Sequence, residues 1–286
     1  MRYEAPETLD RAVQLLAAEG GIARVLAGGT DLLVQIKTEM IEPDLVIDIK
    51  KIGELRSITE EAGGFRIGAA VTGAELKEHP KLSKVWPGLV EAANLIGSTQ
   101  IQGRATMGGN LCNGSPAADS VPALIAAGAK ATIVGPKGRR DVPVEDVMLA
   151  PRKLSLTKGE MVASFLLPPR GKHAADAYLR FIPRTEMDIA VVACGVSLAL
   201  DAKGVCTAAR VALGAVAATP LLVADAAKAL IGTSLDAAAM DKAAVAASAA
   251  CRPIDDKRGT KDFRISVAGV LTRRAVEIAR NRAKKG

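Results

Sequence analysis

The sequence is poor in aromatic residues and in cysteines, and each shortage excludes a class of protein. Its 286 residues include four Phe, two Tyr and one Trp, which is too few for a surface that stacks successive nucleic-acid bases. The four cysteines form no Cys-x-x-Cys pair, so neither a zinc knuckle nor an iron–sulfur site is encoded locally. The only two histidines, His79 and His173, stand far apart in the sequence. We expect no metal site in this chain.

Long apolar runs and strong charge are also missing. No stretch of about 18 apolar residues is present to span a bilayer, and the residues after Met1 lack the basic-then-apolar order of a secretion signal. We therefore expect a cytoplasmic protein with reduced thiols and no membrane span. The net charge of +7 is modest, and its densest cluster, near the C-terminus, is typical of a solvated helix end. Binding to nucleic acid is not expected.

A mixed pattern of helices and strands is present, with one clear break. Hydrophobic residues make up 49% of the chain, which is enough for a sizeable core, and the length suggests about two domains. Pro168-Pro169-Arg170-Gly171 interrupts both kinds of regular structure. We predict one domain over residues 1–170, with subdomains near 1–55 and 56–170, and a second over 175–286.

The two predicted domains differ in their patterns. Before the break, the apolar patterns predict helices over 8–19, 88–96 and 120–127 and short strands over 24–27, 44–49, 65–70 and 129–134. This alternation indicates small α/β units. After it, strands over 177–182, 191–200 and 208–215 precede three alanine-rich helices over 220–230, 237–250 and 267–284. The turn at Asp201-Ala202-Lys203-Gly204 joins two of these strands as a hairpin, so their sheet is antiparallel. The overall prediction is an α+β fold whose second domain carries its helices on one face of the sheet.

The usual nucleotide-binding motifs are absent, but two double-glycine motifs are present. There is no G-x-G-x-x-G and no P-loop. Residues 27–31 read AGGTD and residues 106–110 read TMGGN, and we predict a turn at each. Consecutive glycines let backbone N–H groups converge on a phosphate. Either motif alone is more often a simple turn, whereas two together predict opposite walls around a diphosphate. Asp31 and Asp119 are also suited to capping the helices that follow them.

These motifs resemble those of a known family. AGGTD at 27–31 and TMGGNLCNGSPAAD at 106–119 are similar to the two FAD-binding motifs of the flavoprotein subunits of molybdenum hydroxylases. That family includes the medium subunit of aerobic carbon monoxide dehydrogenase and the flavin domain of xanthine dehydrogenase, and the resemblance covers nearly the whole chain. It implies two small subdomains of the PCMH type that hold FAD between them. A C-terminal domain of the CO dehydrogenase flavoprotein type would follow.

The resemblance also implies a set of cofactor-binding residues. The first motif would line the diphosphate, the second would form the opposing wall, and one acidic residue would bind another polar part of FAD. Three further positions contact FAD apolarly in relatives, and one basic residue lies near the flavin, where some relatives have Lys and this chain has Arg. The implied residues are Leu26, Ala27, Gly28, Gly29, Thr30, Asp31, Ile96, Gly97, Thr106, Gly108, Gly109, Asn110, Asp119, Val162 and Arg180.

The function implied is that of an electron-transfer subunit. In the family, a large subunit with molybdopterin oxidises the substrate, a small subunit with two 2Fe-2S clusters relays the electrons, and the flavoprotein passes them to an acceptor. A dimer of such heterotrimers is expected. No side chain of this chain is expected to act as a catalytic acid or base. Two alternatives remain open: a self-contained FAD-dependent oxidoreductase, and a basic nucleic-acid-binding protein without flavin.

Overall fold

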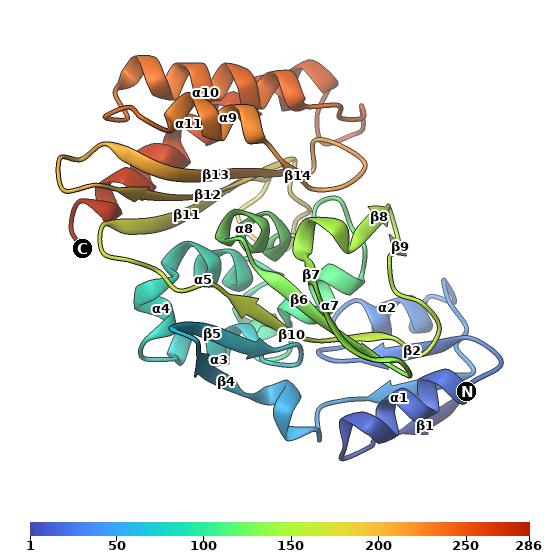
Figure 1. The fold of residues 1–286 in the computed structure, drawn as a ribbon. Coiled ribbons are helices and arrows are strands. Elements are labelled where there is room, and N and C mark those ends of the chain that lie inside the picture. Colours follow the sequence, from blue (N-terminus) through green and yellow to red (C-terminus); the bar gives the residue numbers. More distant parts are fainter.

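The computed structural model describes residues 1–286 and stacks them in three parts (Figure 1). The N-terminal part is a parallel sheet of order β1-β3-β2. Thr8 caps the first helix by accepting a hydrogen bond from the backbone N–H of Arg11, and the helix buries Leu9, Ala12 and Leu16, as its helical spacing predicts. The elements are β1 (Arg2–Glu4), α1 (Leu9–Ala18), β2 (Ala23–Leu26), α2 (Leu32–Lys37) and β3 (Leu45–Asp48).

The central part is an antiparallel sheet of order β4-β5-β10-β6-β7. Its strands are β4 (Ile58–Glu61), β5 (Gly64–Gly68), β6 (Lys130–Gly135), β7 (Gly138–Pro143) and β10 (Met161–Leu167). Around it lie η1 (Gly53–Arg56), α3 (Gly73–Glu78), α4 (Leu82–Val85), α5 (Pro87–Asn94), α6 (Thr99–Gln102), α7 (Met107–Cys112), α8 (Ser120–Ala127) and η2 (Val144–Asp146), with a small hairpin of β8 (Met148–Ala150) and β9 (Lys153–Leu154).

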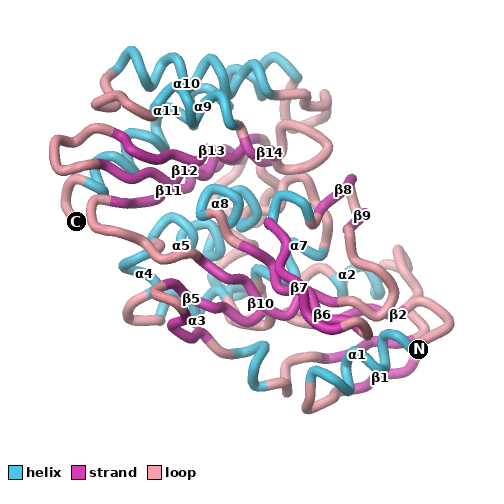
Figure 2. The backbone as a smooth tube through the Cα atoms, viewed as in Figure 1, coloured by secondary structure: helices cyan, strands magenta, loops and turns pink.

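The C-terminal part is the predicted antiparallel sheet with helices on one face (Figure 2). Its elements are β11 (Ala174–Phe181), β12 (Val192–Leu200), β13 (Cys206–Gly214), β14 (Leu221–Leu222), α9 (Ala224–Leu230), α10 (Ala237–Ala250) and α11 (Lys261–Ala283). Three predicted starts in this part are wrong by three residues or more, and the first is that of β11, which begins earlier than predicted, at Ala174. Residues 221–222 pair with β13 as a short strand, so α9 starts later than predicted, and the cap at Thr260 starts α11 earlier.

The helix α8 joins the central and C-terminal parts into one body. Every residue of α8 is buried, and the helix ends at Gly128, whose φ of +69° favours glycine. Its other side lies so close to β12 that a side chain at Gly195 would come within 2.6 Å of the carbonyl oxygen of Pro122. The larger hydrophobic core accordingly includes Tyr178 and Ala193 from the C-terminal sheet. No helix combines the length and the hydropathy needed to cross a bilayer.

Candidate cofactor site

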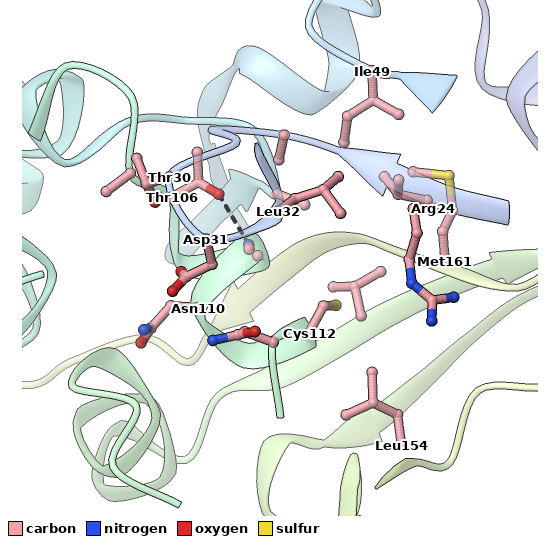
Figure 3. Close-up of a pocket in the computed structure, with 18 of the residues that line it drawn as sticks. Arg24, Thr30, Asp31, Leu32, Ile49, Thr106, Asn110, Cys112, Leu154 and Met161 are labelled. Carbon is pink, nitrogen blue, oxygen red and sulfur yellow. Dashed lines mark hydrogen bonds between the residues drawn. The ribbon is translucent and has the colours of Figure 1, made fainter. Parts of the chain in front are cut away.

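A cavity of about 430 Å³ lies where the N-terminal and central parts meet (Figure 3). Small-molecule sites commonly occupy about 300–1,000 Å³. Its wall combines the segment between β2 and α2, the start of α7, strand β10 and the β8–β9 hairpin. Nine of the residues named from the sequence line it: Ala27, Thr30, Asp31, Ile96, Thr106, Gly108, Gly109, Asn110 and Val162. The two double-glycine motifs, far apart in sequence, therefore lie against one cavity.

The first motif forms a tight connection at the carboxyl end of β2. Gly29 has a φ of +80°, in the left-handed region that favours glycine. A side chain at Gly28 would come within 2.0 Å of the backbone oxygen of Arg104, so this backbone packs directly against the segment before the second motif. The N–H groups from Ala27 to Asp31 donate to no other backbone group. A row of free donors beside a cavity is suited to an anion such as a phosphate.

The second motif is a helix, not the predicted turn. Residues 107–112 form α7, and Thr106 caps it by accepting a hydrogen bond of 2.9 Å from the N–H of Gly109. Met107 and Leu111 give this short helix a buried apolar side, which stabilises it despite its two glycines. Gly108 is needed for packing, because a side chain there would come within 2.4 Å of the backbone oxygen of Ala69. The helix therefore places its first turn directly at the cavity wall.

The side-chain amide of Asn110 is held in one orientation. Its Oδ1 accepts hydrogen bonds from the backbone N–H of Ser120, at 3.0 Å, and from the hydroxyl of Ser120, at 2.7 Å. A backbone N–H group only donates, so the atom facing it must be the amide oxygen. The Nδ2 group of Asn110 donates to nothing within the chain. Because Asn110 lines the cavity, it offers a bound ligand a hydrogen-bond donor.

Asp31 stands at the N-cap position of α2, but its carboxylate caps no backbone N–H group. Figure 3 shows this carboxylate directed toward Asn110. Burial raises the pKa of Asp31 above its usual range. The side chain is therefore free to accept a hydrogen bond from a hydroxyl group of a ligand.

Six residues named from the sequence do not line the cavity. Leu26 precedes the first motif, and Gly28 and Gly29 belong to it but do not line the cavity. Gly97, with a φ of +71°, follows the lining residue Ile96. The other two, Asp119 and Arg180, form a buried ion pair of 2.6 Å between Arg180 Nη1 and Asp119 Oδ2.

The carboxylate of Asp119 does not cap α8, although the residue occupies the N-cap position. It accepts a second hydrogen bond, of 2.9 Å, from the hydroxyl of Tyr178. Burial raises the pKa of Asp119 to about 6, while Arg180 and Tyr178 act in the opposite direction. The Asp119–Arg180 pair thus holds α8 to β11, next to the Ser120 that orients Asn110.

The Asp119–Arg180 pair should make folding stability depend on pH in a predictable way. Arg180→Met removes the cation that lowers the pKa of Asp119, so that pKa should rise further above about 6. A carboxyl whose pKa is raised by folding contributes stability at low pH and loses it as the pH rises through the folded-state pKa. From about pH 6 upward, until the pH passes the variant's own higher pKa, the variant should lose stability relative to wild type by up to about 1.4 kcal/mol per pH unit. Urea unfolding at several pH values measures this slope. Arg180→Lys, which keeps a cation, should retain the wild-type slope, and parallel curves for Met and wild type would contradict the prediction.

Several cavity residues were missed by the sequence analysis. Gln35 Nε2 donates to Asn113 Oδ1 at 2.9 Å and so bridges α2 to the end of α7. Gln35 lies four residues after Asp31, on the same face of a helix. This spacing could have indicated that Gln35 faces the same site as Asp31. Arg24 and Arg152 also line the cavity. Their positions, in a strand and in a hairpin turn, carry no motif that would have singled them out.

Comparison with known proteins identifies similar chains over the full length. A family model described as the FAD binding domain in molybdopterin dehydrogenase matches residues 1–170, and one described as the CO dehydrogenase flavoprotein C-terminal domain matches residues 177–279. The carbon monoxide dehydrogenase medium chain of Afipia carboxidovorans is 36% identical over 282 residues, which covers 99% of this chain and 97% of the relative. A putative xanthine dehydrogenase FAD-binding subunit of Escherichia coli is 34% identical, with 97% and 95% covered.

Solved structures are similar as well. A chain of reconstituted CO dehydrogenase from Oligotropha carboxidovorans superposes with a TM-score of 0.94 at 35% identity, covering 99% of this chain and 98% of that one. A chain of quinoline 2-oxidoreductase from Pseudomonas putida gives a TM-score of 0.90 at 29% identity, with the same coverage.

Proposed function

The chain belongs to the family of FAD-binding subunits of molybdenum hydroxylases, and from that premise we propose that it binds FAD and passes electrons from a partner subunit to an external acceptor. One observation carries the proposal: both glycine motifs lie against the same cavity. The relatives are chains or subunits of dehydrogenases, which supports an electron-transfer subunit over a self-contained oxidoreductase.

The residues at the cavity fit FAD. The free N–H groups between Ala27 and Asp31 suit the diphosphate, and Asn110 adds a side-chain donor. Asp31 is free to accept from a ribityl or ribose hydroxyl. Ile96 and Val162 supply apolar surface. When bound, FAD supplies the electron chemistry; the residues of this chain bind and orient it, and none needs to move a proton.

The finer assignments belong to the same proposal. We assign FAD binding to the fifteen residues named from the sequence, six of which support the cavity from outside its wall. The FAD-binding domain would span 1–170 and the C-terminal domain 175–286; in support, β10 ends at Leu167 and β11 begins at Ala174. The partners would be a large molybdopterin subunit and a small subunit with two 2Fe-2S clusters, in a dimer of heterotrimers. The four cysteines are free thiols, which fits the cytoplasm.

The first experiment is to purify the chain with its partner subunits, record the visible spectrum, and identify the cofactor released on denaturation by chromatography. One FAD for each copy of this chain is expected. A complex that contains no FAD, and takes up none when FAD is added, would overturn the proposal. Turnover of an organic substrate at full rate by the isolated chain would overturn the subunit role while leaving the FAD site.

Asn110→Asp tests the donor at the cavity wall. The new carboxylate keeps both hydrogen bonds from Ser120, so the fold should be unchanged. It replaces the free Nδ2 donor with an oxygen that repels the diphosphate, and we expect FAD affinity to fall by about tenfold to a hundredfold, from the loss of a hydrogen bond to a charged group. Titration of the flavin-free complex with FAD measures the change. Unchanged affinity would remove Asn110 from the assignment.

A further inference from the structure

The part of the cavity wall that contains α2 is weakly joined to the rest of the chain. Residues 29–41, here called the α2 segment, line the cavity with Thr30, Asp31, Leu32, Gln35 and Ile41, and Figure 3 shows the first three of these beside it. No residue of the segment is buried. The apolar side chains of Leu33 and Val34 are 55% and 58% exposed, whereas a surface helix normally buries its apolar face. The α2 segment therefore gains little stability from packing.

Few hydrogen bonds hold the α2 segment in place. Every backbone hydrogen bond of residues 29–41 joins two residues of the segment itself. Side chains add two hydrogen bonds to the rest of the chain. Gln35 Nε2 donates to Asn113 Oδ1 at 2.9 Å, and Arg152 Nη2 donates at 3.5 Å to the sulfur of Met40, which is a weak acceptor. The Gln35–Asn113 bond is thus the stronger of the two contacts that hold the segment against the opposite wall.

The residues on the two sides of this bond differ in how firmly they are held. Asn113 directly follows α7, and the carbonyl of the next residue, Gly114, accepts a hydrogen bond from the N–H of Arg152 at 2.8 Å. Gly28 is also held, by its close packing against the segment before the second motif. Gly29, with a φ of +80°, follows it and has the wide conformational range of a glycine. The α2 segment can therefore turn about Gly29 while the second motif stays in place.

The shape of FAD makes such a movement useful. The molecule carries a ring system at each end and is narrow at the diphosphate between them. A molecule of this shape enters a two-sided site either by threading one ring system between the walls or by the opening of one wall. The weak attachment of the α2 segment makes the second route available.

We propose that the α2 segment is a lid that opens about Gly29 to admit FAD, and that the Gln35–Asn113 hydrogen bond holds this lid closed. The inference rests on the proposed function and adds a conformational step to it. The bond joins two side chains of the protein, so it stabilises the closed lid in flavin-free and flavin-bound protein alike. Its loss should therefore speed FAD binding and FAD release by the same factor and leave the dissociation constant unchanged.

The test measures both rates in the complex with its partner subunits. Binding of FAD to the flavin-free complex is followed by stopped-flow fluorescence, and release by displacing bound FAD with an excess of 5-deaza-FAD, whose absorption differs. Gln35→Met keeps the length of the side chain without its donor. Both rates should rise about threefold to tenfold, as expected for the loss of one neutral hydrogen bond, and the dissociation constant should stay within about twofold.

Two further positions provide controls. Asn113→Ala removes the acceptor of the same bond and should raise both rates as Gln35→Met does. The double variant should be no faster than either single variant, because only one bond is lost. Thr38→Val changes the same segment but removes only hydrogen bonds that stay within it, so both rates should match wild type.

Hydrogen exchange tests the opening of the lid without any flavin. In the flavin-free complex, the N–H groups of residues 30–41 should exchange about threefold to tenfold faster in Gln35→Met than in wild type, while those of α8 should be unchanged. This measurement does not depend on whether the complex binds FAD.

The outcomes are distinguishable. Equal rises in the rates of binding and release support the lid. A rise in the release rate alone, with a larger dissociation constant, would overturn it and make Gln35 a contact to the flavin. Unchanged rates in a complex that binds FAD would overturn it as well. Faster exchange in a complex that binds no FAD would refute the proposed function and leave the opening of the α2 segment standing.

Discussion

Gly28→Ala is expected to remove most of the bound FAD. The added methyl group would come within 2.0 Å of the backbone oxygen of Arg104, and a backbone carbonyl has no rotamer by which to move away. The segment from Ala27 to Asp31 would have to move away from the residues that precede the second motif, and the two walls of the proposed diphosphate site would separate. Overpacking of this kind costs about 1–3 kcal/mol. If that cost falls on the bound geometry, FAD affinity drops by about tenfold to a hundredfold.

Two other glycines provide graded controls. A methyl group at Gly109 would meet only the hydroxyl oxygen of Thr106, at 3.1 Å, and one at Gly20 would meet nothing within 4 Å. FAD content should therefore be near wild type in Gly20→Ala, slightly reduced in Gly109→Ala and lowest in Gly28→Ala. The measurement is the flavin-to-protein ratio of the purified complex, with circular dichroism to confirm folding. An identical ratio in all three variants would refute the role of Gly28 in joining the two motifs.

The spacing of apolar residues in the sequence was sufficient to predict an element where that element has one clear apolar face or is buried throughout. The spacing of Leu9, Ala12 and Leu16 places α1, and the continuous apolar run from Ser120 to Ala127 is α8 to the residue. In both cases burial in the fold and local propensity favour the same structure. The strands β12 and β13 were predicted because the turn between them, at Asp201-Ala202-Lys203-Gly204, has a sequence signal of its own.

Periodicity failed where tertiary contacts decide the local structure. The two glycines of α7 indicate a turn by local propensity, and only the burial of Met107 and Leu111 with the cap at Thr106 makes the segment helical. The first motif was recognisable from its glycines, but the residues at the other end of the cavity were not. Arg24 looks like any exposed arginine of an edge strand. It lines the cavity because β10 and the β8–β9 hairpin, which are distant in sequence, line the same space.

The predicted break between the two domains is a second place where tertiary contacts decide the local structure. Pro168-Pro169-Arg170-Gly171 has the composition of an exposed connection, yet the side chain of Arg170 is only 5% exposed. Its guanidinium carbon lies 3.5 Å from the ring centroid of Trp86, and its Nη1 donates to Asp176 Oδ1 at 2.8 Å. The other oxygen of Asp176 accepts from the N–H of Leu89, at 2.8 Å. This buried cluster fastens the start of β11 to the N-terminal end of α5, across the boundary between the two predicted domains.

Asp176→Asn is expected to cost about 3–5 kcal/mol of folding stability, because it leaves the Arg170 guanidinium buried without its counter-ion. The double variant Arg170→Met with Asp176→Asn removes the uncompensated charge and should be more stable than Asp176→Asn alone. Urea unfolding followed by tryptophan fluorescence is well suited to both, since the single Trp of the chain is Trp86, directly beside Arg170.

The control for the buried Arg170–Asp176 pair is the exposed pair of Lys228 and Asp225, whose side chains are 75% and 79% exposed. Asp225→Asn should change stability by less than about 1 kcal/mol. A loss of folding stability in Asp176→Asn no larger than in Asp225→Asn would show that the Arg170–Asp176 pair does not hold the C-terminal sheet in place. The expected large loss would mean that the C-terminal domain is fixed to the cofactor-binding domain by a charge. In that case the position of β11 depends on the Arg170–Asp176 pair near its start. The same pair then also determines the position of Arg180, which lies further along β11 and pairs with Asp119.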